Sequence, residues 1–327
     1  MKNAISGIHH ITALASDPQR NLDFYVRVLG LRMVKQTVNF DLPDVYHFYY
    51  GDEVGTPGTL LTFFPFPGAG RGKRGIGEVS SVAFSVPPAG REYWIGRLAQ
   101  HGIPFDGPLE RFDDELIAFH DPDGMQLELV FIESAESGQI WKDGPVPVEF
   151  ALRRFHGVTL TLGILQPTAS LLTDTMGFRI LHPNGDFVRF LAGTGNGQAA
   201  VDICIRPTLP PARQSAGSVH HIAWRVPDDS THRLWQKKIA DTGLPVTEIV
   251  DRQYFHSIYY NEPGGVLFEI ATDPPGFLID ESKGQLGTRL KLPPWLEPQR
   301  KLSEQLLPPV SLPGISLATI HEPQEQG

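Results

Sequence analysis

The chain has 327 residues, 41% of them hydrophobic and 20% charged, a composition that excludes a mostly disordered protein and allows a large core. Its net charge of −9 gives no electrostatic reason to expect nucleic acid or an anionic membrane as a partner. A single cysteine, Cys204, excludes an internal disulfide framework and fits a reducing compartment. No stretch resembles a signal peptide or reaches the roughly 20 apolar residues of a membrane span, so we expect a cytoplasmic protein.

The first 65 residues predict a strand, a helix and three further strands. Residues 7–15 alternate in polarity and are rich in strand-forming side chains. Asp17 and Pro18 follow as a helix N-cap and a proline at the first helical position. The helix should end at Gly30, and its apolar stripe consists of Leu22, Tyr25, Val26 and Leu29. The three β-like runs after it are Leu31–Phe40, Val45–Tyr50 and Thr59–Phe64.

This βαβββ unit recurs three more times along the chain. New copies begin with strands at 79–86, 155–162 and 219–226, each followed by a helical stripe and a glycine. In the fourth copy we expect Leu234, Trp235 and Ile239 in the helix, followed by Gly243. Val79–Pro87 matches Val219–Pro227 at an offset of 140, which indicates a duplicated pair of modules. The predicted fold is α+β, with four βαβββ modules forming two cupped mixed β-sheet domains and the helices outside.

The repeat also suggests where the chain divides. A polar stretch with a Gly-Pro-Val-Pro segment separates the second module from the third, and the C-terminal end is rich in proline. We expect that extension to wrap over the body of the protein. The expected N-terminal domain is 1–146 (modules 1–78 and 79–133, then a linker), the C-terminal domain is 147–280 (modules 150–215 and 216–280), and the extension is 281–327.

The first strands of the modules select candidate metal ligands. Modules one and four carry His-His pairs, His9-His10 and His220-His221, whereas the corresponding residues are Ser80-Ser81 and His156-Gly157 in modules two and three. Only His10 and His221 are therefore histidines at the second position of the pair. Glu269 lies on the last strand of module four, where module one has Thr62 and Phe63. We predict one metal site made of His10, His221 and Glu269, which requires module one to pair with module four.

Three segments resemble a known family. Gly7-Ile-His-His-Ile-Thr12, Gly55-Thr-Pro-Gly58 with Thr62-Phe-Phe-Pro65, and Pro263-Gly-Gly-Val-Leu-Phe-Glu269 are similar to segments of the vicinal oxygen chelate superfamily, which contains glyoxalases, bleomycin-resistance proteins and extradiol dioxygenases. Within it they most resemble ring-cleaving dioxygenases that act on para-hydroquinones, over about residues 5–300. The resemblance agrees with the ligand set above. Catechol-cleaving relatives imply an alternative set of His156, His221 and Glu269, which stays open here.

Two imidazoles and one carboxylate are the donor set of non-haem Fe(II) oxygenases, and Mn(II) would fit the same ligands. Tyr259 has the strand parity to face the metal, and the resembled family has a tyrosine there. Thr12 shares the strand face of His10 and is a candidate substrate contact. The resemblance implies acid–base or hydrogen-bonding roles for His9 and His220. It also implies an active-site arginine near Arg252 and His256, where this chain is shorter than some relatives, and leaves its identity open.

Other motifs are weaker. Gly70-Arg-Gly-Lys-Arg-Gly75 satisfies G-x-G-x-x-G but precedes a strand instead of opening a helix, so we expect a linker and no dinucleotide. No nucleophile motif is present. The remaining histidines should be structural or solvated: His47, His101, His120, His182, His232 and His321.

The expected function is an Fe(II)-dependent extradiol-type ring-cleaving dioxygenase that inserts O₂ into a hydroquinone or catechol-like aromatic. The expected partners are thus a small aromatic substrate and O₂, with self-association left open. Two alternatives share the fold: a metal-dependent glyoxalase-type lyase or isomerase, and a non-catalytic protein that sequesters a small molecule. The first would be expected to use a fourth protein ligand, which the Thr62-Phe63 strand does not supply.

Overall fold

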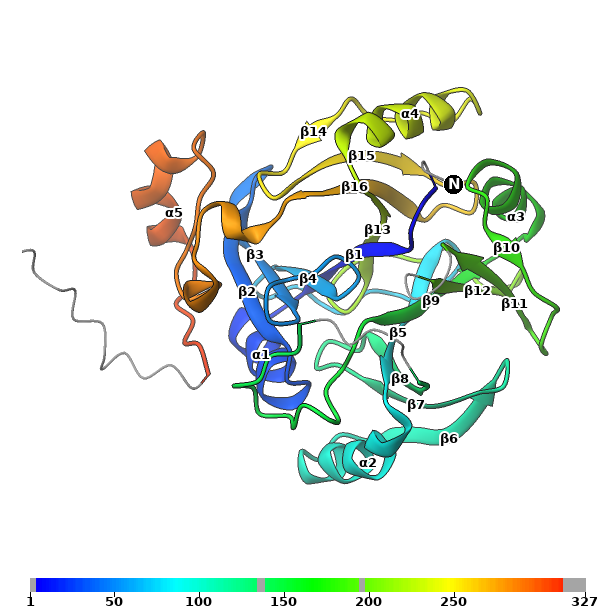
Figure 1. Cartoon of the computed structure of the whole chain (residues 1–327), viewed down its shortest axis with the longest axis horizontal. Coiled ribbons are helices and arrows are strands. Elements are labelled where there is room, and N and C mark those ends of the chain that lie inside the picture. Colours follow the sequence, from blue (N-terminus) through cyan, green and yellow to red (C-terminus); the bar gives the residue numbers. More distant parts are fainter. Residues whose placement is uncertain (1–3, 134–138, 194–197, 314–327) are drawn as a thin grey trace, which may run out of the picture.

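Two eight-stranded mixed sheets with helices on their outer sides form the protein (Figure 1). The computed structural model describes residues 4–133, 139–193 and 198–313. The predicted α+β class with four repeated modules is confirmed. His321 and the end of the C-terminal extension lie outside the described residues.

The first sheet combines the first and the fourth modules. Its strand order is β14-β15-β16-β13-β1-β4-β3-β2, and β1 pairs antiparallel with β13 at its centre. The predicted pairing of module one with module four is therefore confirmed. The strands are β1 (Ile8–Ala15), β2 (Arg32–Asn39), β3 (Leu42–Gly51), β4 (Leu60–Pro65), β13 (Val219–Val226), β14 (Val250–Asp251), β15 (Phe255–Asn261) and β16 (Leu267–Pro275).

The second sheet combines the second and third modules in the same manner. Its order is β10-β11-β12-β9-β5-β8-β7-β6, with the antiparallel pair of β5 and β9 at its centre. Each sheet thus takes one module from each predicted half of the chain, and the domain boundaries themselves stay a prediction. The strands are β5 (Glu78–Val86), β6 (Phe105–Arg111), β7 (Asp114–His120), β8 (Gln126–Phe131), β9 (Phe155–Leu162), β10 (Arg179–Ile180), β11 (Phe187–Ala192) and β12 (Ala199–Ile205).

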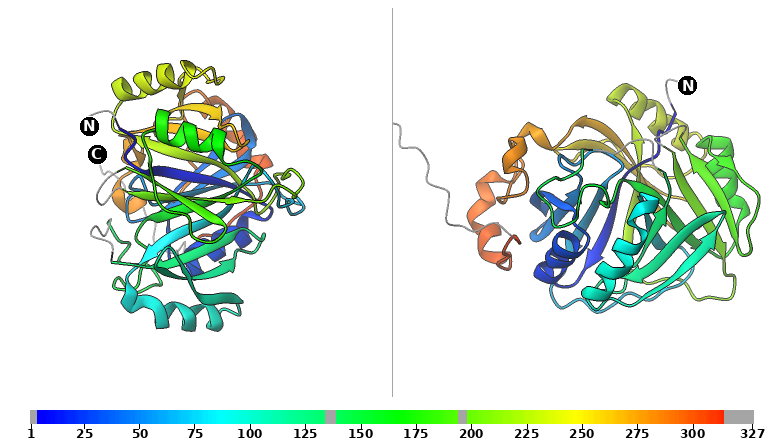
Figure 2. Two further views of the ribbon diagram at one scale, coloured as in Figure 1. Left: turned by 90° about the vertical axis from the view of Figure 1, so that its right-hand side faces the viewer. Right: turned by 60° about the horizontal axis from the view of Figure 1, so that its bottom comes forward.

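The helices lie on the outer sides of the sheets (Figure 2). Asp17 caps α1 as predicted, because its side chain accepts a hydrogen bond from the backbone N–H of Arg20. Leu234, Trp235 and Ile239 all lie in α4 as predicted; Trp235 and Ile239 are buried, whereas Leu234 is 53% exposed. Neighbouring helical residues point about 100° apart, and the sheet covers only the side of Trp235. The helices are α1 (Pro18–Asp23), α2 (Arg91–Gln100), α3 (Gln166–Ser170), α4 (Asp229–Ala240) and α5 (Arg300–Leu306), with π-helical turns at Phe24–Val28 and Leu171–Thr175 and 3₁₀ turns at Pro88–Gly90, Phe277–Ile279, Lys283–Gln285 and Glu297–Gln299.

The central strand pairs contain two matching irregularities. In β1 the register passes from Ile8 to His10, leaving His9 as an extra residue, and in β13 it passes over His220 in the same way. These β-bulges disturb the strict alternation of side chains. They therefore set the direction of the first histidine in each pair.

Part of the C-terminal extension lies along β2 and β3, where α5 is drawn in red beside them (Figure 1). Lys291 donates a backbone hydrogen bond to Gln36 on β2, and Leu292, Leu296 and Leu307 are buried. Lys35, on the same strand, is fully buried and pairs with Asp280 and Glu281. Among the described helices none has the length and hydropathy to cross a membrane.

Candidate metal centre

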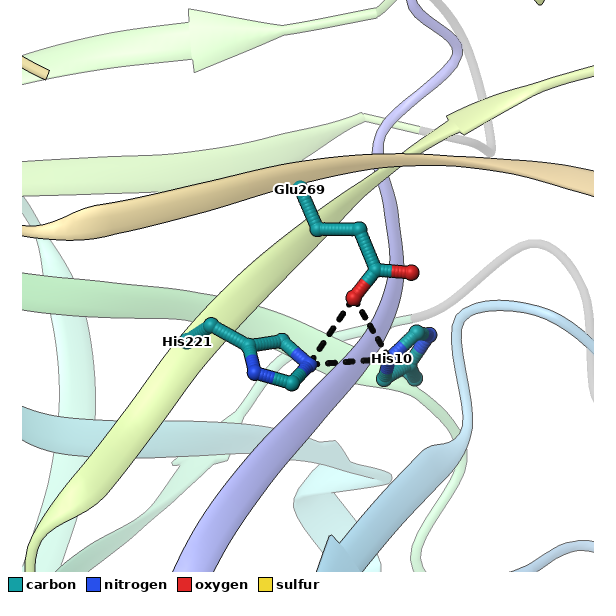
Figure 3. Close-up of side chains that lie close together, drawn as sticks. All are labelled: His10, His221 and Glu269. Carbon is teal, nitrogen blue, oxygen red and sulfur yellow. Dashed lines mark hydrogen bonds and ion pairs between the residues drawn. The ribbon is translucent and has the colours of Figure 1, made fainter. Parts of the chain in front are cut away.

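Three ligand-type side chains from three adjacent strands converge in the first sheet (Figure 3). The Nε2 atom of His10 on β1 lies 3.3 Å from Nε2 of His221 on β13. Oε2 of Glu269 on β16 lies 3.4 Å from the first nitrogen and 2.9 Å from the second. Among the described residues this is the one group of three or more His, Cys, Asp or Glu side chains positioned to hold a metal ion.

The strand register explains this convergence. Ala223 on β13 is opposite His10 on one side and opposite Glu269 on the other. His221 lies two residues before Ala223 and therefore projects from the same face. Ala223 presents only a methyl group between His10 and Glu269 on this face, so the two longer side chains can approach each other above it.

The three atoms fit a common divalent ion. Ligand atoms bound at about 2.1 Å lie about 3.0 Å apart when their bonds are perpendicular and about 3.4 Å apart in tetrahedral geometry. The separations of 2.9, 3.3 and 3.4 Å fall close to this range. Oε2 of Glu269 is also buried and accepts no well-formed hydrogen bond within the described chain, whereas Oε1 accepts one from Ser257. The orphaned oxygen points at the position a cation would take.

The electrostatics of the site favour an ionised carboxylate at Glu269 and a neutral imidazole at His221. Burial raises the pKa of Glu269, but His10 and His221 outweigh this effect and hold that pKa well below its ordinary value. Burial lowers the pKa of His221, and Glu269 opposes this shift only in part. A carboxylate with two unprotonated imidazoles is the form that binds a metal.

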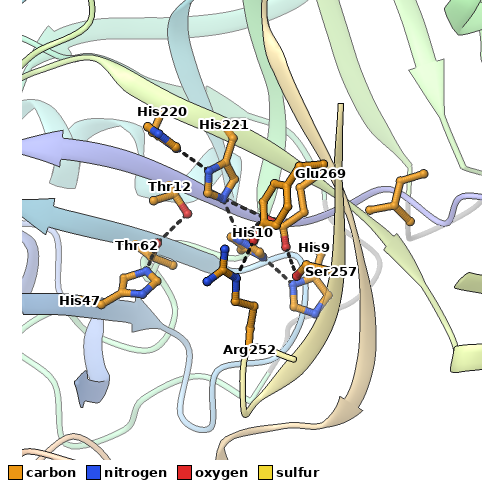
Figure 4. Close-up of polar contacts among 12 residues, drawn as sticks. His9, His10, Thr12, His47, Thr62, His220, His221, Arg252, Ser257 and Glu269 are labelled. Carbon is orange, nitrogen blue, oxygen red and sulfur yellow. Dashed lines mark hydrogen bonds and ion pairs between the residues drawn. The ribbon is translucent and has the colours of Figure 1, made fainter. Parts of the chain in front are cut away.

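His9 and His220 support the two histidine ligands from behind (Figure 4). Nδ1 of His9 lies 2.9 Å from Nδ1 of His10, and Nδ1 of His220 lies 2.8 Å from Nδ1 of His221. When each ligand donates its Nδ1–H to its neighbour, Nε2 carries a lone pair for the metal, as in other metal sites with oriented histidines. The bulges produce these contacts, and sequence alternation alone did not predict them.

A cavity of about 510 Å³ opens beside the ligands, and His10, His220 and His221 form part of its wall. This volume is typical of a site for a small organic molecule. Most of the remaining wall is apolar and aromatic, and its members include Leu14, Phe40, Phe64, Phe66, Phe255 and Leu267.

Tyr259 and Arg252 form a polar corner of this cavity. Nε of Arg252 donates to the Tyr259 hydroxyl at 3.1 Å, and the Tyr259 ring lies 5.8 Å from the His221 ring, centroid to centroid. Arg252 also forms a 2.9 Å ion pair with Asp41, which joins the β2–β3 turn to the β14–β15 turn. Burial raises the pKa of Tyr259 despite the nearby guanidinium, so Tyr259 remains a neutral hydroxyl donor. The sequence left the arginine unassigned, and the structure places Arg252 at the cavity.

Three residues that the sequence suggested for the metal centre or its surroundings, Thr12, His9 and His156, do not line the cavity. Thr12 is fully buried and bonded to Thr62 at 2.8 Å, and it does not line the cavity. His9 is buried behind His10 and is likewise absent from the cavity wall. His156 lies on β9 in the second sheet, with Nε2 3.3 Å from Asp114, so the structure does not bring it to His221 and Glu269. His47 was expected to be structural or solvated, but it lines the cavity.

The second sheet has a salt-bridge cluster at the place that corresponds to the metal centre. Glu128, the counterpart of Glu269, pairs with Arg111, whose Nε lies 3.1 Å from Asp202. Arg189 joins the same Asp202 at 2.7 Å. In this sheet guanidinium groups neutralise the buried carboxylates, and so one metal centre per chain is expected.

The metal-free protein should lose stability as the pH falls below about 6.5. Burial lowers the pKa of His220 to about 4, and it also lowers the pKa values of His9 and His47. Between the unfolded value and the lowered folded value, only the unfolded chain binds these protons, which costs up to about 1.4 kcal/mol per pH unit for each imidazole. Urea unfolding in EDTA between pH 7.5 and 4.5 measures this loss, and His220→Gln should make it shallower. An unfolding midpoint that stays constant or rises on acidification would contradict this account.

The comparisons with known proteins agree with this description. The family model "Glyoxalase/Bleomycin resistance protein/Dioxygenase superfamily" matches residues 7–129 and 154–279. A Bacillus subtilis protein named "Putative ring-cleaving dioxygenase MhqO" is 44% identical over 309 residues, covering 94% of this chain and 98% of the relative. The "Chlorohydroquinone/hydroquinone 1,2-dioxygenase" of Sphingobium indicum is 35% identical over 301 residues, covering 90% of this chain and 93% of that protein.

Two solved structures have the same fold as this chain. The crystal structure of a "putative dioxygenase" from Bacillus subtilis has a TM-score of 0.91 at 44% identity, and the match covers 95% of this chain and 99% of that one. Glyoxalase I from Zea mays has a TM-score of 0.59 at 12% identity, with coverage of 82% and 92%. The second likeness shows the shared fold alone.

Proposed function

Because the chain belongs to the Glyoxalase/Bleomycin resistance protein/Dioxygenase superfamily, we propose that it is a metal-dependent ring-cleaving dioxygenase acting on a hydroquinone-type aromatic. The observation that carries the proposal is the convergence of His10, His221 and Glu269 beside a cavity walled by aromatic side chains. Relatives named as ring-cleaving dioxygenases, similar over nine-tenths of the chain, support the reaction type.

His10, His221 and Glu269 would hold the metal, and we propose Fe(II), because this donor set is that of non-haem iron oxygenases. When bound, the iron would supply the electron-transfer chemistry that lets O₂ react with an aromatic ring, and three protein ligands leave coordination positions open. The reaction needs no outside reductant, since both oxygen atoms enter the product as a ring carbon–carbon bond breaks.

The protein groups around the cavity would bind the ring through hydrogen bonds and apolar contacts. His220 lines the cavity and, with its pKa lowered to about 4 by burial and by His221, is an unprotonated imidazole near neutral pH. Its Nδ1 accepts the hydrogen bond from His221, so the neutral ring carries its proton on Nε2 and can donate a hydrogen bond to a substrate oxygen. Tyr259 receives a hydrogen bond from Arg252 and keeps its own O–H free to donate to a substrate oxygen. His9 and Thr12 are buried away from the cavity, so we assign them positioning roles instead of substrate contact.

The glyoxalase-type alternative has less support from the first module. Thr62 takes the position in β4 that Glu269 takes in β16, since Thr12 pairs with Thr62 as Ala223 pairs with Glu269. Its hydroxyl is engaged by Thr12 and His47, so this strand supplies no fourth acidic ligand.

Oxygen-electrode assays test the proposal. Protein loaded anaerobically with Fe(II) should consume O₂ when methylhydroquinone, chlorohydroquinone or catechol is added, with the hydroquinones preferred, and Zn(II)-loaded protein should not. Tight iron binding without oxygen consumption on any of these substrates would contradict the proposed activity. Turnover of a hemithioacetal without O₂ would favour the glyoxalase-type alternative.

A further inference from the structure

His47 occupies a position in the first module that corresponds to a residue of the metal centre in the fourth. Tyr49 on β3 pairs with Thr62 as Tyr259 on β15 pairs with Glu269. His47, two residues before Tyr49, is thus the counterpart of Ser257. Ser257 is fully buried and donates to Glu269, whereas the larger His47 reaches the cavity wall.

The ring of His47 is held in one orientation. Its Nε2 lies 2.9 Å from the Thr62 hydroxyl, which lies 2.8 Å from that of Thr12 (Figure 4). The ring also packs between Tyr49 and Phe64, with centroid separations of 4.0 and 4.2 Å. In the described part of the chain no hydrogen bond engages Nδ1, so this nitrogen is available to a molecule in the cavity.

His47 can act as either a hydrogen-bond donor or an acceptor. Burial and the neighbouring imidazoles lower its pKa well below the ordinary value, so the ring is neutral. If Nε2 donates to Thr62, Nδ1 accepts a hydrogen bond from the cavity, and if Thr62 donates to Nε2, Nδ1–H donates. A phenolic hydroxyl satisfies either arrangement.

The polar groups that line the cavity come from both the first and the fourth modules. Tyr259 and Arg252 come from the fourth module, beside the ligand His221, and His47 comes from β3 of the first module. His47 is joined through Thr62 to Thr12 on β1, the strand that carries His10, and no hydrogen bond or ring contact joins it to a metal ligand in the described chain. Phe64 packs on His47 and Phe255 packs on His10, and both rings line the cavity.

We propose that His47 binds the distal hydroxyl of a 1,4-dihydroxy aromatic whose first oxygen is held at the metal centre. This inference rests on the proposed function and specifies its substrate class. The para position carries the oxygen farthest from the metal-bound one, so a para hydroxyl is the group best placed to meet a side chain that does not touch the metal ligands. The second oxygen of a catechol would lie beside the metal and leave Nδ1 of His47 unpaired, which disfavours catechols.

Binding measurements on the anaerobic Fe(II) protein test this assignment independently of turnover. Hydroquinone and p-cresol have nearly the same shape, but a methyl group replaces the distal hydroxyl in p-cresol. The wild-type protein should bind hydroquinone about 10-fold more tightly than p-cresol, the effect of one hydrogen bond to a neutral partner. His47→Phe should bind both equally, and His47→Gln should restore part of the preference.

His101→Phe is the matched control, because His101 is exposed and does not line the cavity. It should retain the full preference. Iron content and the urea unfolding midpoint of each variant establish that it is folded and loaded. If His47→Phe keeps the preference, or weakens both ligands equally, the inference is wrong while the proposed activity stands. If the preference depends on His47 but no substrate consumes O₂, the proposed activity is the part that fails.

Discussion

Replacing His10 with alanine is expected to lower the affinity for Fe(II) by more than about 100-fold and to abolish oxygen consumption. Changes to the hydrogen-bonding partners of metal ligands already cost 10–100-fold, and loss of a ligand should cost more. His10 contributes one of three converging atoms, and without it His221 and Glu269 retain only two.

The control for this variant is His156→Ala. His156 belongs to β9 of the second sheet and contacts Asp114, whereas the three ligands belong to the first sheet. The His156→Ala variant should bind one equivalent of iron, as the wild-type protein should. Dialysis against buffered iron followed by metal analysis measures this. Iron retained in His10→Ala but lost in His156→Ala would select the alternative ligand set.

Replacing Lys35 with methionine should destabilise the protein by about 3–5 kcal/mol. Lys35 is fully buried, its Nζ lies 2.6 Å from Asp280, and it forms a second, closer pair with Glu281. Methionine fills a similar volume but leaves two carboxylates, Glu281 being 5% exposed, without their cation. The free energy of unfolding from urea titration, at fixed pH, measures the effect.

Lys237→Met is the matched control. Lys237 pairs with Asp241 on α4 at 2.7 Å, but both side chains are more than 60% exposed, so its loss should change stability by less than about 0.5 kcal/mol. Adding Asp280→Asn and Glu281→Gln to Lys35→Met should recover part of the loss. Equal effects of Lys35→Met and Lys237→Met would contradict the importance of the buried pairs at the start of the extension.

The repeat made the first sheet predictable. The loss of histidines at Ser80-Ser81 and Gly157 indicated which modules carry ligands, and this in turn required β1 to lie beside β13. The pattern of residues could not give the bulges at His9 and His220, because a bulge depends on how two distant strands align.

Two residues that reach the cavity from neighbouring elements could not be assigned to the site from the sequence. His47 and Arg252 have no pairing pattern in the sequence, and they meet the site only because the sheet brings β3 and the β14–β15 turn to the same cavity. The partners of Lys35 were equally hidden, since Asp280 and Glu281 follow it by about 245 residues. Charge and periodicity describe single strands well, but they do not describe which strands face each other.

Isotope labelling tests the central claim most directly. The Fe(II)-loaded protein is incubated with methylhydroquinone under ¹⁸O₂, and the ring-opened product is trapped and analysed by mass spectrometry. Incorporation of two oxygen atoms from O₂ into one product molecule, absent from His10→Ala, is the result that the structure predicts. Oxidation to the quinone without ring opening, or a ring-opened product whose new oxygen atoms both come from water, would contradict the assignment as a ring-cleaving dioxygenase.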